Sequence, residues 1–286
     1  MASLVLGTSQ FHVHKQPERN LESVVRHIRL ATTRGAHLVH FPEACLSGYL
    51  GVEIRSRRDV DWHRLTSAMR EVMAAATQYR VWVVIGCNHR LTGQHKPHNS
   101  LYVIDHRGQL VNRYDKMFCT GRNEKEQDLR HYSPGDSLVT FFVRGVKCGL
   151  LICHDFRYPE LFREYKRRGV ELMLVSFHNA GMKREGYDRY MMYVPAAIQA
   201  AAASNYFTVS ANNGTRKYAW PSFVVNAEGV VIDRARPHRA TVLVNTVDTK
   251  QRLFDASAAW RERCMRGVLH SGTLVRDPRS RNRTAL

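Results

Sequence analysis

Two hydrophobic patterns alternate along most of the chain, from residue 4 to residue 247. Short apolar runs between polar residues are typical of buried strands, whereas apolar residues every three or four positions predict helices with one buried face. Helices are expected from about 20 to 34, with Asn20 as N-cap and Gly35 ending the helix, and then over 62–78, from Pro159 onwards, and over 188–203. The predicted strands cover residues 4–8, 37–41, 81–87, 100–104, 109–114, 139–143, 147–152, 170–176, 206–211, 222–226, 230–233 and 240–247.

The connections between these elements indicate the fold class. Polar turns at residues 105–108, 144–145 and 227–229 predict hairpins, while other strands are separated by helices. This mixture predicts a single α/β domain whose sheets carry helices on their outer faces. We expect the domain to cover residues 1–260 and residues 261–286 to form a basic tail that either packs on a partner subunit or stays loose. Residues 117–137 are polar and are expected to be irregular.

Composition places the chain among ordinary globular proteins. Hydrophobic residues make up 44% and charged residues 24% of the chain, and no apolar run is long enough to span a bilayer. The first ten residues lack the basic region of a signal peptide. The six cysteines are scattered without paired spacing, which favours reduced thiols and a cytoplasmic location.

The charge balance is unusual for such a protein. Lys and Arg number 43 against 25 Asp and Glu, which gives a formal charge of +18. A binding protein that uses its basic surface for a polyanion is therefore an alternative to an enzyme. The basic residues are nevertheless spread along the chain, apart from clusters at 166–168 and 276–283, and no nucleic-acid-binding motif accompanies them. Specific nucleic-acid binding is not expected.

One cysteine lies where thiol chemistry is favoured. Cys153 follows the apolar run 150–152, and Pro159 can open a helix shortly afterwards. Backbone N–H groups and the helix dipole at such a position favour a thiolate or an oxyanion. A buried structural cysteine is the alternative, because free cysteine is among the most buried residue types.

Glu43 and Lys116 share the position of Cys153 just past the end of a predicted strand. Ligands bind at that edge of open α/β sheets, so the three side chains can meet in one pocket. A thiol to attack, a carboxylate to take its proton and an ammonium to stabilise an oxyanion suit nucleophilic acyl transfer. A solvated glutamate and a surface lysine are the alternatives for the other two residues.

The segments around these residues resemble the signature motifs of the nitrilase, or carbon–nitrogen hydrolase, superfamily. They are residues 41–49 (FPEACLSGY), 114–116 (YDK) and 153–160 (CHDFRYPE), in the family's order. Further similarity at 133–135, 220–223, 227–229 and 247–248 extends the resemblance over about residues 3–250. It implies a four-layer α-β-β-α sandwich, paired with a second copy in a homodimer or larger homo-oligomer.

The resemblance also implies roles for the site residues. Glu43 would be the general base, Cys153 the nucleophile, and Lys116 would stabilise the tetrahedral intermediate together with the backbone N–H of His154. The expected product of the first step is a thioester that water then hydrolyses. Lys116 would additionally lower the pKa of the thiol. Neither a metal nor an organic cofactor is expected, since Cys45, Cys119, Cys153 and His154 lack paired ligand spacing.

The sequence departs from the family pattern in two places. Many members carry a second glutamate after the lysine; here Asp128 occupies that register, with Glu124 and Glu126 as nearby candidates. The family's usual charged segment in the late helix is replaced by residues 200–204 (AAAAS), which removes charged contacts expected near a subunit interface.

The substrate is predicted only by class. His154-Asp155 follows the nucleophile, whereas true nitrilases have Trp-Glu, so a small-molecule amide is the leading expectation. N-carbamoyl hydrolysis and nitrile hydrolysis are the alternatives. Position alone suggests Tyr49, His154, Arg157, His178 and Asn179 as pocket residues. Arg157 can pair with a substrate carboxylate or instead with Asp155 or Glu160.

Overall fold

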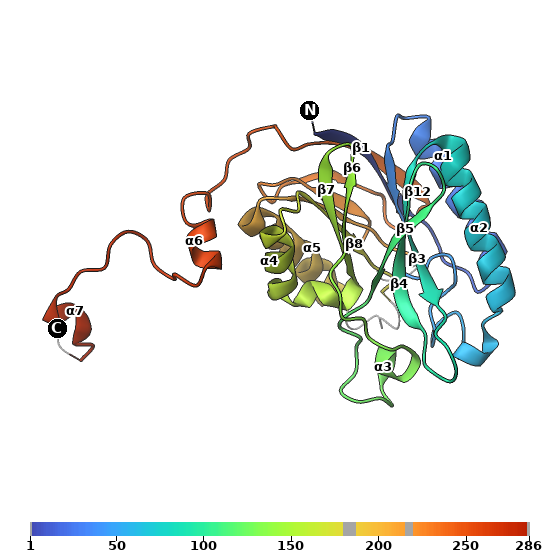
Figure 1. Ribbon diagram of the computed structural model, residues 1–286, viewed down its shortest axis with the longest axis horizontal. Helices are drawn as coiled ribbons and strands as arrows, with labels where there is room; N and C mark the ends of the chain where they lie inside the picture. Colours follow the sequence, from blue (N-terminus) through green and yellow to red (C-terminus); the bar gives the residue numbers. More distant parts are fainter. Residues whose placement is uncertain (1, 180–186, 215–219, 285–286) are drawn as a thin grey trace. The chain divides into compact units, whose positions relative to one another are not determined.

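A computed structural model describes residues 2–179, 187–214 and 220–284, and for residues 187–191 the backbone alone. In this part of the chain the strands form two six-stranded sheets packed face to face, with helices covering both outer faces (Figure 1). The four-layer α-β-β-α sandwich and the α/β class predicted from the sequence are confirmed.

The first sheet has the strand order β12-β1-β2-β3-β4-β5. Strands β1, β2 and β3 are parallel to one another. Strand β4 is antiparallel to both of its neighbours, so β5 runs in the same direction as β3. Apolar side chains of two long helices, including Ile28 and Val72, pack with Val39 and Val83 on its outer face. The strands are β1 (Ser3–Gln10), β2 (Leu38–His40), β3 (Trp82–His89), β4 (His98–Ile104), β5 (Leu110–Asp115) and β12 (Thr241–Asp248), and the helices are α1 (Pro17–Thr32) and α2 (Trp62–Tyr79).

The second sheet has the order β11-β10-β9-β8-β7-β6, and its central strands β7, β8 and β9 are parallel. Phe162, Tyr165 and Ile198 belong to the apolar cluster that joins its outer face to two helices. The strands are β6 (Thr140–Val143), β7 (Val146–Ile152), β8 (Leu172–Ser176), β9 (Thr208–Ala211), β10 (Phe223–Val225) and β11 (Val231–Arg234), and the helices are α4 (Pro159–Arg167) and α5 (Tyr187–Asn205).

A buried polar bridge crosses the otherwise apolar space between the sheets. His40 on β2 makes hydrogen bonds to the hydroxyls of Ser210 (Nδ1, 2.9 Å) and Ser176 (Nε2, 2.8 Å) in the opposite sheet. Burial lowers the pKa of His40 to about 3, so its ring is neutral. Because unpaired buried polar groups are costly, the bridge favours one alignment of β2 against β8 and β9.

Two details of the sequence interpretation are wrong. The first helix begins at Pro17, and Asn20 lies inside it, where its side chain bonds the backbone of His14 and Leu46 instead of capping the helix. Residues 117–137, expected to be irregular, contain the short helix α3 (Gln127–His131). Five residues are too few to show a helical period, so the sequence carried no pattern for this helix.

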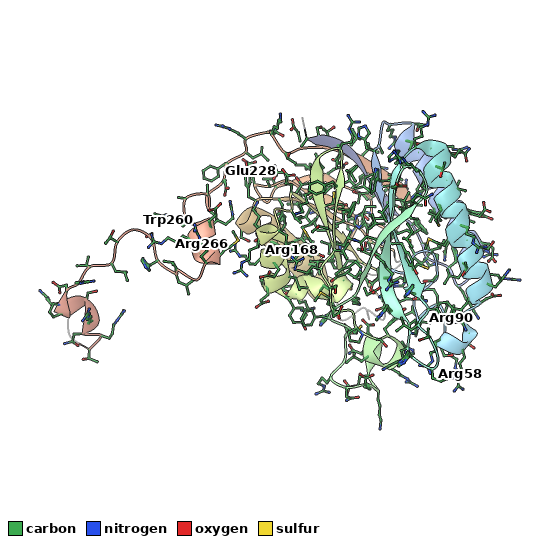
Figure 2. The ribbon with its side chains drawn as sticks, in the orientation of Figure 1. Arg58, Arg90, Arg168, Glu228, Trp260 and Arg266 are labelled. Carbon is green, nitrogen blue, oxygen red and sulfur yellow. The ribbon has the colours of Figure 1, made fainter. Side chains whose placement is uncertain are left out.

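The chain divides into two compact units, Met1–Asp255 and Ala256–Leu286. The second unit contains α6 (Arg261–Met265) and α7 (Pro278–Arg281). In the first unit, exposed arginines such as Arg58, Arg90 and Arg168 lie on different elements, in keeping with the dispersed charge of the sequence (Figure 2). None of the described helices has the length and hydropathy needed to cross a bilayer.

Candidate active site

Glu43, Lys116 and Cys153 meet at one edge of the sandwich, as the sequence predicts. Each follows a strand: β2, β5 and β7, respectively. Lys116 Nζ lies 3.0 Å from Glu43 Oε1, and both side chains are almost completely buried. The Cys153 thiol is close enough for both charges to act on its pKa. Residues from both sheets therefore contribute to one charged, buried cluster.

The Glu43 carboxylate is held in a fixed orientation. Its Oε2 accepts from the backbone N–H of His178 at 2.8 Å, just after β8. Its Oε1 accepts from Lys116 and from the side-chain amide of Asn99 on β4, at 2.7 Å. Asn99 was not among the predicted site residues, because an asparagine in a hairpin strand gives no sequence signal of such a contact.

Lys116 lies between two carboxylates. Its Nζ is 2.7 Å from Asp128 Oδ2 as well as 3.0 Å from Glu43. Burial alone would lower the pKa of Lys116, but the charges of Asp128 and Glu43 outweigh burial and raise this pKa well above its usual value. Lys116 is therefore a cation at neutral pH.

Among the acids considered for the second carboxylate, Asp128 is the one that contacts Lys116. It lies on α3, where its Oδ1 accepts from the Tyr49 hydroxyl at 2.5 Å. Burial would raise the pKa of Asp128, but Lys116 outweighs it and the pKa is lowered, so the group is ionised. Glu124 instead pairs with Lys96, and Glu126 accepts from Asn123.

Cys153 occupies a sharp turn from β7 into a 3₁₀ helix, Cys153–Arg157. Its φ of 44° lies in the left-handed region, which is strained for a residue with a side chain. Burial and the Glu43 carboxylate raise the pKa of the thiol, and Lys116 lowers it without reversing the shift. Lys116 thus lowers the pKa of the thiol as expected, but burial and Glu43 outweigh it, and a neutral thiol needs a base to activate it.

Asp155 stabilises this turn from within. Its carboxylate accepts from the backbone N–H groups of Ile152 (3.0 Å) and Phe118 (2.8 Å) and from the Tyr114 hydroxyl (2.8 Å). It thereby links the turn at Cys153 to the segment that carries Lys116. Burial raises the pKa of Asp155 to about 6. The sequence singled out Asp155 as part of the His154-Asp155 pair and as an alternative partner for Arg157, but it did not predict these three donors.

The residues predicted to contact substrate lie around this cluster. Tyr49 is buried, its hydroxyl binds Asp128, and its ring lies against His178. The His178 ring is buried, with Nε2 3.1 Å from Glu53 but outside hydrogen-bond geometry. Asn179 is also buried, with a left-handed φ of 61° and no hydrogen-bond partner for Nδ2 in the described residues. Asn179 thus follows directly on His178, whose backbone N–H binds Glu43.

Arg157 and His154 lie in the 3₁₀ helix that begins at Cys153, and both are partly exposed. The guanidinium of Arg157 lies 5.4 Å from the ring centre of Phe156 and 5.1 Å from that of Tyr193. The half-buried His154 packs edge-on against Tyr158. Whether Arg157 or His154 contacts substrate stays a prediction. Among the described residues, no group of His, Cys, Asp and Glu is arranged to hold a metal ion.

Comparisons with known proteins agree with this geometry. A family model described as carbon–nitrogen hydrolase matches residues 5–252. A hydrolase in the agr operon of Staphylococcus lugdunensis is 27% identical over 68% of this chain and 80% of its own length. The (R)-stereoselective amidase of a Pseudomonas species is 31% identical over 62% of this chain and 58% of its own.

Solved structures show the same fold. An amidase from a Nesterenkonia species superposes with a TM-score of 0.77 at 21% identity, covering 94% of this chain and 98% of its own. Another structure of that amidase, a mutant, carries the acetamide moiety of fluoroacetamide covalently at its active-site cysteine, with a TM-score of 0.74 at 20% identity, covering 85% of this chain and 90% of its own.

Proposed function

The chain belongs to the carbon–nitrogen hydrolase family, and on this basis we propose that Cys153, Glu43 and Lys116 hydrolyse a small-molecule amide to a carboxylic acid and ammonia. Family membership makes the protein a hydrolase of carbon–nitrogen bonds other than peptide bonds. The observation that carries the residue roles is the buried cluster itself: a neutral thiol at a strained turn, beside a fixed carboxylate and a lysine held as a cation.

Acylation begins with proton transfer from the Cys153 thiol to Glu43. Sγ then attacks the amide carbonyl carbon, and the electron pair of the C=O bond moves to oxygen. The Lys116 ammonium and the backbone N–H of His154 stabilise this oxyanion. The oxyanion collapses, Glu43 returns its proton to the leaving nitrogen, and ammonia departs from a thioester on Cys153.

Deacylation uses the same base. Glu43 removes a proton from water, and the oxygen attacks the thioester carbonyl. The carbon–sulfur bond breaks, the acid leaves, and the thiolate of Cys153 recovers the proton from Glu43. The net change is amide plus water to acid plus ammonia. The orientation of Glu43 by His178 and Asn99 serves both steps.

Asp128 and Tyr49 act in this scheme as positioning residues. Asp128 holds Lys116 at 2.7 Å and favours its charged form. Tyr49 donates to the other oxygen of Asp128 and so fixes that carboxylate. Asp128 is one methylene shorter than the glutamate that many family members carry. Its position on α3 places its carboxylate 2.7 Å from Lys116.

Amides are favoured as substrates by the activities of similar proteins. The Pseudomonas relative is named as an amidase, and the cysteine of the Nesterenkonia amidase accepts an acetamide moiety. N-carbamoyl compounds and nitriles would use the same nucleophile and form the comparison classes of the test. Assembly into a homo-oligomer, docking of the tail on a partner subunit and a cytoplasmic location stay predictions.

Ammonia release from four substrate classes tests the proposal. The panel contains short aliphatic amides, dicarboxylate monoamides, N-carbamoyl amino acids and nitriles, with Cys153→Ala as the blank. We expect release from an amide class that Cys153→Ala abolishes while its melting temperature stays near that of the wild type. Turnover confined to nitriles or N-carbamoyl compounds would overturn the amide assignment. If folded protein released no ammonia and bound polyanions independently of Cys153, the binding alternative would hold.

A further inference from the structure

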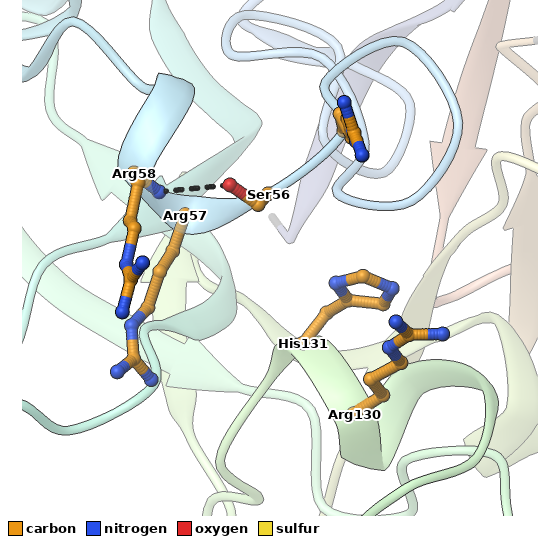
Figure 3. Close-up of a pocket in the computed structure, with 6 residues that line it drawn as sticks. Ser56, Arg57, Arg58, Arg130 and His131 are labelled. Carbon is orange, nitrogen blue, oxygen red and sulfur yellow. Dashed lines mark hydrogen bonds between the residues drawn. The ribbon is translucent and has the colours of Figure 1, made fainter.

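A strongly basic pocket lies beside α3, apart from the residues of the catalytic cluster. It has a volume of about 460 Å³ and is lined by Arg55, Ser56, Arg57, Arg58, Arg130 and His131. The segment that leads into η1 (Arg57–Asp59) forms one wall, and Arg130 and His131 project from α3 on the other (Figure 3). The volume falls within the range of about 300–1,000 Å³ that is typical of small-molecule sites.

Among the residues that the structure describes, no salt bridge neutralises the arginines of this pocket. Within the described residues, the guanidinium groups of Arg55, Arg57, Arg58 and Arg130 have no hydrogen-bonded or ion-paired partner. The nearest acids in sequence have other partners: the Asp59 carboxylate accepts from the Ser56 hydroxyl at 2.9 Å, and Asp128 pairs with Lys116. Arginines that line one pocket repel one another, so an anion bound between them would relieve this repulsion.

The pocket and the catalytic cluster share their structural supports. Asp128, which holds Lys116, lies one helical turn from His131 on the same helix. The opposite wall follows Tyr49, whose hydroxyl binds Asp128. His131 also packs on the segment that precedes the first wall: a Cβ at Gly51 would lie 2.8 Å from Nε2 of His131. A ligand that binds both walls would therefore contact the segments that hold Asp128 in position.

We propose that this pocket binds a small ligand that carries at least two phosphate or carboxylate groups. Planar guanidinium groups match the geometry of both anions through paired N–H donors, and the arginines on the two walls can engage separate groups of one ligand. The anion has two possible sources: the distal end of the substrate itself, or a separate effector molecule. Recognition at the pocket does not require turnover, so it can be tested whatever the outcome for the amide assignment.

Calorimetric titration with inorganic pyrophosphate, at an ionic strength held constant with sodium chloride, tests recognition directly. The full-length wild type is compared with Arg57→Gln/Arg130→Gln, which removes one charge from each wall. The matched control is Arg29→Gln/Arg70→Gln, which removes two exposed charges from α1 and α2. Melting temperatures establish that all three proteins are folded.

We expect the pocket variant to weaken pyrophosphate binding by about tenfold or more, and the control variant to bind within about twofold of the wild type. Equal weakening by both variants would mean general charge attraction and would overturn the proposal. Absence of saturable binding by the wild type, to pyrophosphate and to citrate alike, would also overturn it.

Kinetics with a turned-over amide then separate the two sources. If the substrate supplies the anion, amides with a distal carboxylate or phosphate lose kcat/KM in Arg57→Gln/Arg130→Gln, and an uncharged amide does not. If a separate effector binds, pyrophosphate changes turnover of the uncharged amide by the wild type and not by the pocket variant. If pyrophosphate binds at the pocket but turnover of the charged and uncharged amides is unchanged, the proposed coupling of the pocket to the catalytic cluster through α3 is contradicted.

Discussion

Lys116 provides the positive charge that makes the buried site possible. Its ammonium lies within 3.0 Å of Glu43 and 2.7 Å of Asp128, in surroundings where an unpaired carboxylate would be costly. Removing one partner of a buried ion pair typically costs about 3–5 kcal/mol of stability, since the other charge is left uncompensated. A substitution of Lys116 would thus disturb fold and chemistry together, whereas Cys153→Ala removes the proposed nucleophile without removing a charge.

Tyr49→Phe separates two roles for this tyrosine. The hydroxyl donates to Asp128 at 2.5 Å, so its loss should loosen Asp128 and Lys116 and reduce transition-state stabilisation. Loss of a hydrogen bond to a charged group predicts a fall in kcat of about tenfold, with KM within about twofold. Steady-state kinetics measure both constants, with Tyr206→Phe as a control because that hydroxyl binds the Leu253 backbone. A raised KM with unchanged kcat would instead make Tyr49 a substrate contact.

The meeting of Glu43, Lys116 and Cys153 could be predicted, because each combines a strand end with a family motif. The partners that orient them could not. Asn99 reaches Glu43 because β4 pairs with β3, and Asp155 bonds three donors only once the backbone turns sharply at Cys153. Such contacts depend on the packed backbone, which a linear pattern of residue types does not encode.

At the scale of elements, the site depends on strands from both sheets ending at one edge. β2 and β8 deliver Glu43 and the backbone N–H that holds it, and β7 delivers Cys153. The hydrophobic pattern predicted these strands, because buried strands are short continuous apolar runs. It missed α3, although α3 carries Asp128 and one wall of the arginine-lined pocket.

The bridge from His40 to Ser176 and Ser210 makes stability depend on pH. The pKa of His40 is about 3 in the fold against 6.5 unfolded, so below pH 6.5 the unfolded chain binds the proton more readily. The stability that neutral His40 contributes through this bridge is fully present above about pH 6.5 and is lost as the pH falls towards 3. Linkage predicts a loss of about 2 kcal/mol between pH 7 and pH 5.

Urea unfolding of wild type and His40→Gln at pH 7 and pH 5 measures how the contribution of His40 to the free energy of unfolding depends on pH. The wild type should lose about 2 kcal/mol more unfolding free energy than the variant over this interval. Comparison of the two proteins cancels the titrations of other groups, such as His27 and Asp155. An equal loss in both proteins would show that His40 does not titrate differently in the two states.

For the whole molecule, the charge of +18 was evident from composition, but its arrangement was not. The sequence singled out residues 166–168 and 276–283 as basic clusters. The pocket instead combines residues 55–58 with Arg130, more than seventy positions away, because α3 packs against the segment after β2. The dispersed charge thus includes a concave site, while exposed arginines such as Arg90 and Arg168 lie on separate segments of the chain.

A thioester at Cys153 is the central intermediate of the proposed reaction, and hydroxylamine trapping tests for this thioester most directly. Amide turnover in the presence of hydroxylamine is followed by hydroxamate and ammonia formation, in wild type and in Cys153→Ala of verified fold. A thioester is attacked by hydroxylamine, so the wild type should form hydroxamate in proportion to the hydroxylamine added, and Cys153→Ala should form neither product above the blank. Undiminished hydroxamate or ammonia from Cys153→Ala would contradict the account, since the acyl group would then be carried or transferred without this cysteine.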